Sequence, residues 1–474
     1  MPPGILEILL VFFQWLFSMG APVIVPVVII ILGLIFRAPM RSTLVAALRM
    51  GVGFTGLYAL IMYILNIYSS VNQSLAKRFG VGTVPDLGWP VFSGITFSVP
   101  WSMVAIAGLM LLNAVLVVIG LTSTLNVDAF NHWPYVYTMA AIYLATGNWI
   151  LAILGGIFFW FITLKMADWT YPFIEPYYNM PGISIPHCHT VNYAPFGFLL
   201  DRVWDRIPVI KDIKLDPDYI RTRFGIVGEP IVIGFVVGLV LGALAYLSWP
   251  VTGQQVASVI NVALATAFFM VLLPRAAELI VMGFAPLSQS IRDFIMKRMP
   301  GREFHLGLDV AVLVGAPEHV ALGALAAPFF YLVAYLLPGN RVIPLADVAG
   351  YTIFFTVWAV NTNHRNLFRG LLNSILVWFP LALWLSNLLI PINMKLISYV
   401  GYTLPQGVSE VTCITIGSNF FASVFLQIMS FIAGVGTLEG LITALAIFIV
   451  WLGAWYITRD RPKEYAKELK GETG

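Results

Sequence analysis

Ten long apolar stretches recur along this 474-residue chain, and they constrain its fold more than any single motif. A helix needs about 20 apolar residues to cross a bilayer, so stretches of this length and number predict a polytopic membrane protein. Only 10% of the residues are charged, against about 25% in soluble domains, which excludes a soluble enzyme. The stretches are residues 5–36, 44–67, 98–121, 136–163, 226–248, 256–282, 307–336, 347–360, 370–393 and 423–457.

We predict an all-α fold with about eleven transmembrane helices. The first and last stretches contain glycine or proline interruptions, so ten to twelve spans fit the sequence. Residues 37–49 and the tail 458–474 are rich in Lys and Arg, and the positive-inside rule places both in the cytoplasm. An external N-terminus and a cytoplasmic C-terminus require an odd number of spans. The first stretch lacks the basic segment of a signal peptide, and we expect it to be retained.

The overall charge and the cysteine count exclude several other functions. The net charge is only +3, which gives no electrostatic footprint for a nucleic-acid partner. Two cysteines, Cys188 and Cys413, cannot form a disulfide framework. The chain has no Walker motif, so we expect no ATP hydrolysis.

The chain reads as a single transmembrane domain with a weak internal repeat. We place the first repeat at residues 1–225, including a polar insertion at 164–225, and the second at 226–457, followed by the tail. Four landmarks recur in the same order, and the loop cations indicate that the copies are inverted, a common plan among secondary transporters. The landmark pairs are Gly53-Phe54 with Gly283-Phe284, Asp86 with Asp309, Asn131-His132 with Asn363-His364, and Pro186 with Pro405.

Asp309 is the first candidate for a binding residue. It sits among apolar residues, where an ionised group costs about 2.5–3.5 kcal/mol on insertion scales, so we favour a functional role. The structural alternative is a helix N-cap, for which Asp is also well suited.

Three histidines are further candidates. His187 and His189 belong to the proline-punctuated segment 180–190, which we interpret as a re-entrant loop because such backbone cannot face lipid. The alternating His187-Cys188-His189 offers poor tetrahedral geometry, so we predict no metal there. His132 can hydrogen-bond to hydroxyl groups, but it also fits a helix start at the membrane interface.

The segment Asp86-Leu-Gly-Trp-Pro90 has the residues of a broken helix, and Trp89 can stack on a ligand. Glu229 lies close to a helix start, where a carboxylate complements the helix dipole. Glu318 and His319 lie at a glycine- and proline-rich break and are treated as structural. No clearly embedded Arg or Lys accompanies the candidates. An anionic substrate would therefore lack a counter-ion, which favours a neutral, hydroxyl-rich solute.

Eight motifs taken together resemble one family, the membrane IIC component of galactitol-type sugar phosphotransferase systems within the ascorbate-galactitol superfamily. The motifs are Val84-Pro-Asp-Leu-Gly-Trp-Pro90, Asn126-Val-Asp-x-x-Asn-His132, Leu144-Ala-Thr-Gly147, Ile183-Ser-Ile-Pro-His187, Arg223-Phe-Gly-x-x-Gly-Glu-Pro230, Gly307-Leu-Asp309, Pro338-Gly-Asn340 and His364-Arg-Asn-Leu-Phe-Arg369.

The resemblance implies a bacterial inner-membrane permease, typically a homodimer with a mobile core domain and a dimerising scaffold. Its substrate is a polyol, galactitol first, and no cofactor or metal is implied. Phosphorylation is coupled to transport through a phosphocysteine on a separate IIB component, which IIA charges. His132, His187 and Asp309 occupy motif positions comparable to ligand-binding residues of the ascorbate branch, with Trp89 as a further contact and Asp86, His189 and Glu229 as a second tier. Asp309 is then the possible base.

Three alternatives stay open from the sequence. The first is a IIC component for a pentitol or another sugar. The second is an ion-coupled secondary carrier, for which intramembrane carboxylates are equally expected. The third is a sensor that has lost transport, which the intact set of polar landmarks disfavours.

Overall fold

The computed structural model describes residues 21–35, 37–79, 84–216, 230–298, 304–313, 316–344, 346–404 and 408–472. The chain is predominantly helical, which confirms the predicted class, although the described residues also include five strands of two or three residues. The number of spans and the division into repeats stay predictions. Among the described residues, four segments are long and apolar enough to cross a membrane: Trp149–Tyr178, Pro317–Leu336, Leu367–Val400 and Leu438–Thr458.

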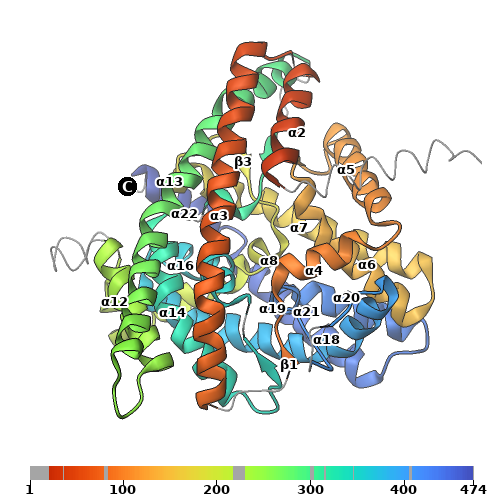
Figure 1. Cartoon of the computed structure of the whole chain (residues 1–474). Helices are drawn as coiled ribbons and strands as arrows, with labels where there is room; N and C mark the ends of the chain where they lie inside the picture. The colour runs from red at the N-terminus through yellow and green to blue at the C-terminus, as the bar shows by residue number, and fades with distance from the viewer. Residues whose placement is uncertain are drawn as a thin grey trace, which may run out of the picture.

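Four helices form an elongated layer along one side of the molecule: α2 (Ala21–Ile35), α3 (Met40–Phe79), α12 (Pro230–Tyr246) and α13 (Gly253–Arg298). In Figure 1, α3 and α13 run beside one another over most of the height of the molecule, with α12 at the lower end. Gly238 of α12 lies so close to α13 that an added Cβ would meet the Cα of Ala263 at 2.6 Å. Small residues allow this close helix approach where lipid supplies no hydrophobic driving force.

The remaining helices form a broader body beside this layer (Figure 1). One predicted stretch, residues 136–163, is divided between two helices, α6 and α7. Gly147 has a left-handed φ of 68° that ends α6, and the Asn148 side chain accepts hydrogen bonds from two amides that begin α7. The helix α7 also continues to Tyr178, so the polar insertion predicted to begin at residue 164 begins inside a helix.

The helices up to residue 336 are α4 (Gly88–Phe97), α5 (Ser102–Ile119), α6 (Trp133–Thr146), α7 (Trp149–Tyr178), α8 (Cys188–Val191), α9 (Ala194–Trp204), α10 (Pro208–Asp212) and α14 (Pro317–Leu336). Those after residue 336 are α15 (Val348–Gly350), α16 (Val357–Asn361), α17 (Leu367–Asn373), α18 (Phe379–Val400), α19 (Ile414–Ser418), α20 (Phe420–Ile432), α21 (Leu438–Thr458) and α22 (Arg461–Lys470).

Two short parallel sheets lie within the body and gather loops that are far apart in the sequence. One sheet has the order β2-β4-β3, formed by Thr124–Asn126, His305–Gly307 and Ile183–Ser184. The other pairs β1 (Val84–Pro85) with β5 (Val342–Ile343), and Asp86 makes a further bridge to Thr412. Parallel strands place their carboxyl ends at the same edge, so the residues that follow each strand converge. Short 3₁₀ or π turns follow or interrupt the helices at Ala129–His132 (η1), Val310–Val312 (η3), Tyr351–Phe355 (η4) and Ser374–Trp378 (η5).

Candidate functional site

The β2-β4-β3 sheet brings His187 and Asp309 together. His187 follows β3 and Asp309 follows β4, and the strands pair through Ser184 and Gly307. Gly307 is required at this crossing, because an added Cβ would meet Pro186 at 2.6 Å and the Cα of Asn126 at 2.9 Å. The sheet therefore positions two of the predicted site residues on neighbouring loops.

The His187 Nε2 atom lies 3.7 Å from Asp309 Oδ2. Asp309 Oδ1 accepts a hydrogen bond of 2.7 Å from the amide of Ala311. One carboxylate oxygen thus caps the turn η3 while the other faces the histidine, so the capping and functional interpretations of Asp309 are compatible. The His187 ring stacks on Phe355 with centroids 5.8 Å apart, and its Nδ1 lies 3.3 Å from Thr190 Oγ1.

His189 lies beside this pair but is tied into the protein. Its ring centroid is 5.1 Å from that of His187. Its Nδ1 donates to the carbonyl of Thr415 at 2.8 Å, and its Nε2 lies 3.4 Å from Asn419 Nδ2. Because both nitrogens have partners, His189 orients the loop. Its ring also packs against Phe355, with centroids 5.2 Å apart, and against Trp133, with centroids 5.7 Å apart.

His132 directly precedes Trp133 and is fully buried. Its Nδ1 lies 3.0 Å from the backbone carbonyl of Asp128, which can only accept, so the proton sits on Nδ1. The structure therefore links His132 to the His187–His189 loop through Trp133 packing.

Several buried polar atoms around this sheet lack a hydrogen-bond partner among the described residues. They are Asn126 Nδ2, Ser184 Oγ, both amide atoms of Asn131, and Asn419 Oδ1. An unpaired buried polar atom costs about 1–3 kcal/mol, and Asn126 and Ser184 contribute such atoms from the strands that flank β4. A polyhydroxylated molecule carries both donors and acceptors for such atoms.

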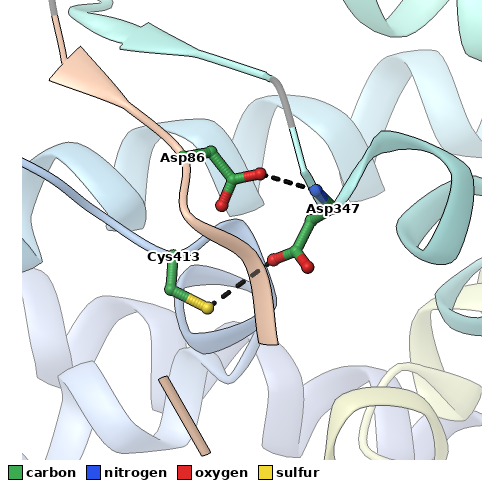
Figure 2. A group of neighbouring side chains, drawn as sticks. All are labelled: Asp86, Asp347 and Cys413. Atoms are coloured by element: carbon green, nitrogen blue, oxygen red, sulfur yellow. Dashed lines mark hydrogen bonds between the residues drawn. The ribbon is translucent and has the colours of Figure 1, made fainter. Parts of the chain in front are cut away.

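The predicted residue Asp86 belongs to a second group, the carboxylate cluster, which we define as Asp86, Asp347 and Cys413 (Figure 2). Asp86 Oδ2 accepts from the Asp347 amide at 2.7 Å, and Oδ1 accepts from the amides of Gly88 and Ile414. The Trp89 amide in turn donates to Asp347 Oδ1 at 2.8 Å.

One carboxylate oxygen each from Asp86 and Asp347 and the sulfur of Cys413 lie within 4.8 Å of one another. By this spacing, the carboxylate cluster could hold a metal ion. Its carboxylates already accept from five backbone amides, three on Asp86 and two on Asp347, at the starts of α4, α15 and α19. Converging amides compensate buried negative charge. The arrangement therefore works as a brace between three distant chain segments.

Thr415 connects the two groups. Its amide donates to Asp347 Oδ2 at 2.8 Å, and its carbonyl accepts from His189 Nδ1. The carboxylate cluster thus fixes the backbone that orients the His187–His189 loop. Glu229, the remaining second-tier prediction, lies outside the described residues.

A third group, the charged end, surrounds the fully buried Asp201 of α9 and carries the C-terminal helix. Arg369 of α17 and Arg461 of α22 each approach an Asp201 oxygen at 3.0 Å. Burial raises the pKa of Asp201 to about 6, nearby Asp205 adds to the rise, and the two arginines oppose it. Other basic residues on α9 and α22, or within a few residues of them, are Arg202, Arg206, Lys211, Arg459, Lys463, Lys467 and Lys470.

Sequence reasoning missed Asp347 and the partners of Glu318 and His319. Asp347 is an acid inside the apolar stretch 347–360, which is the signal that identified Asp309. Glu318 is ion-paired to Arg365, and His319 hydrogen-bonds to Asn361, in contacts that join distant segments and leave no local pattern.

Long apolar helices and buried polar loops together are typical of a polytopic membrane protein. The family described as "PTS system sugar-specific permease component" matches residues 15–407. The chain therefore belongs to this family of phosphotransferase-system (PTS) permeases.

Similar proteins come from Escherichia coli. A protein of strain K12 named "Putative permease IIC component" is 33% identical over 92% of this chain and 98% of its own length. The "PTS system galactitol-specific EIIC component" of strain K12 is 31% identical over 85% of this chain and 89% of its own length. The protein of the same name from strain O157:H7 has the same identity and coverage.

Proposed function

We propose that this permease translocates a neutral polyol, with galactitol as the first candidate, and presents it for phosphorylation by a separate phosphorylated IIB protein. The observation that carries the proposal is the His187–Asp309 pair, which follows the two strands β3 and β4 and lies beside the polar side chains of Asn126 and Ser184. Two similar proteins named as galactitol-specific support the choice of polyol.

A neutral substrate suits the charges at the site. Among the described residues, no lysine or arginine side chain hydrogen-bonds or forms an ion pair with His187, His189 or Asp309. A carboxylate and histidines can accept from and donate to hydroxyl groups, whereas an anionic sugar requires a cation. We place His132 and Trp89 as outer contacts of the same ligand.

The chemical step that follows is phosphoryl transfer. A substrate hydroxyl oxygen forms a bond to phosphorus, and the phosphorus–sulfur bond of the IIB phosphocysteine breaks to release the thiolate. Asp309 Oδ2 orients the hydroxyl and accepts its proton, while Oδ1 stays engaged with the Ala311 amide. Catalysis of such transfers depends on positioning and charge, which a capped, immobile carboxylate supplies.

We further propose that the chain contains two inverted repeats. The two sheets support this proposal because their strand orders match. In one sheet the central strand β4 lies between β2 and β3, and in the other the central segment, β1 with Asp86, lies between β5 and the bridge to Thr412. When the two sheets are aligned in this way, Asp86 of the first repeat corresponds to Gly307 of the second, two residues before Asp309. Asn131-His132 precedes α6, whereas Asn363-His364 follows α16, so these two landmarks are not equivalent. Pro405 lies outside the described residues.

The elongated layer of α2, α3, α12 and α13 suits the scaffold of a homodimer, and the body with both sheets suits a core that moves against it in an elevator-like manner. The α3 helix exposes apolar residues such as Leu48 and Val52, at 69% and 61%, for contact with a second copy or lipid. The charged end gathers basic residues, which the positive-inside rule places in the cytoplasm with the C-terminus.

The test is galactitol phosphorylation by membrane vesicles supplied with phosphorylated IIA and IIB. We expect activity in the wild type and a large loss in the His187→Ala variant. Normal activity in His187→Ala would contradict the site assignment. Uptake of unmodified galactitol driven by a proton gradient without IIB would instead support the ion-coupled carrier, and phosphorylation of a pentitol alone would change the substrate.

A further inference from the structure

A strained corner lies at the charged end, between α16 and α17. His364 and Arg365 are consecutive residues with φ angles of 54° and 61°, in the left-handed region that favours glycine. Each such residue costs about 1–3 kcal/mol and persists only where the surroundings enforce it, most often at functional sites. The corner directs both side chains outward, with 46% of the His364 side chain and 37% of the Arg365 side chain exposed.

A buried carboxylate holds Arg365 in place. Glu318 is 2% exposed, and its Oε2 lies 3.1 Å from Arg365 Nη2. Tyr177 donates from its hydroxyl to Glu318 Oε1 at 2.8 Å. A guanidinium carries five N–H donors in a planar fork, so a carboxylate on one edge is compatible with an anion on another.

The same network reaches the turn that carries Asp309. His319, next to Glu318, has its Nδ1 2.9 Å from the carbonyl of Leu313, which ends η3. Its Nε2 lies 2.6 Å from Asn361 Oδ1, on the helix that leads into the corner. The corner and the Asp309 turn are therefore fixed to one another through His319.

We infer that Arg365 binds the phosphoryl group that the donor protein presents during transfer. This inference rests on the proposed function, because it assigns a residue to the same reaction. The dianionic group arrives at the charged end, where the guanidinium neutralises it while phosphorus passes from sulfur to the substrate oxygen. Arg365 stays protonated throughout, and the hydroxyl proton goes to Asp309. The cationic residues that the donor meets beside the corner are Arg369 and Arg461, which both pair with Asp201.

The experiment compares Arg365→Gln, Arg365→Lys and the double variant Glu318→Gln/Arg365→Gln in vesicles. The double variant avoids an unpaired buried carboxylate, which a single Arg365→Gln change leaves behind. Arg341→Gln is the matched control, since Arg341 also pairs with a glutamate, Glu410, away from the corner. Equilibrium binding of galactitol without IIB and phosphorylation with phosphorylated IIB are measured separately.

We expect galactitol binding to stay within about twofold of wild type in all variants. Phosphorylation should fall at least about 100-fold in both Gln variants, about tenfold in Arg365→Lys, and not in Arg341→Gln. Wild-type phosphorylation in the double variant, or an equal loss of binding and phosphorylation, would overturn the inference. A wild-type protein that binds galactitol but is not phosphorylation-competent would overturn the proposed function instead.

Discussion

Replacing Asp309 by asparagine separates the two roles that the structure gives this carboxylate. Oδ1 caps η3 through the Ala311 amide, and Oδ2 faces His187. Asparagine keeps one oxygen and is as good an N-cap as aspartate, so the free energy of unfolding should change by less than about 0.5 kcal/mol. Asp309→Ala removes the cap as well and should cost about 1 kcal/mol more.

Galactitol binding and phosphorylation should respond to Asp309→Asn much more strongly than the free energy of unfolding does. A hydrogen bond from a substrate hydroxyl to a charged acceptor contributes about 1.5–3 kcal/mol, so Asp309→Asn should weaken galactitol binding about 10- to 100-fold. Phosphorylation should fall further, because the neutral amide cannot accept the hydroxyl proton.

The assay pairs thermal unfolding of the purified protein with equilibrium galactitol binding and vesicle phosphorylation. Asn148→Ala is the matched control for loss of a cap, since the Asn148 side chain caps α7 through the amides of Ile150 and Leu151. Asp309→Asn with wild-type affinity and phosphorylation would refute the functional role and leave Asp309 as a cap. Equal losses of stability and affinity in Asp309→Asn would refute the separation of roles.

Three further predictions concern stability. Asp347→Ala leaves the backbone amides of Trp89 and Thr415 without their acceptor and should destabilise the protein by about 2–6 kcal/mol. The unfolding midpoint should therefore fall, and an unchanged midpoint would show that the carboxylate cluster is not needed for stability. Because the pKa of Asp201 is raised to about 6, the folded protein binds more protons than the unfolded chain between about pH 4 and 6. The free energy of unfolding should therefore fall as the pH rises through that range, and Asp201→Asn should flatten this dependence. An identical slope in the variant would exclude Asp201 as its cause. Gly417→Ala would place a Cβ 2.5 Å from the carbonyl of Ala382 and should lower the unfolding midpoint, whereas a neutral result would mean that α18 and α19 can move apart.

The helical membrane class follows from the apolar stretches alone, because burial in lipid demands long runs of such residues. The break between α6 and α7 was not predicted, although Gly147 and Asn148 are residues of the types that end and begin helices. His187 and Asp309 stood out because a polar group is costly in an apolar segment.

The remaining features depend on tertiary pairing. The strand contact of Val84 with Val342 brings Asp86 next to Asp347, and no local pattern specifies that register. The backbone amide of Trp89 donates to Asp347, a contact between distant segments that the neighbours of Trp89 in the sequence do not indicate. Arg365 carries no sequence signal of strain, because its φ angle follows from the packing of α16 and α17.

The most direct test of the account is the chemical form of labelled galactitol recovered inside vesicles that contain this protein, with and without phosphorylated IIB. We predict that label accumulates as galactitol phosphate when phosphorylated IIB is present, and that the yield falls in Asp309→Asn and Arg365→Gln. Accumulation of free galactitol against a gradient without IIB would contradict the coupling of transport to phosphorylation.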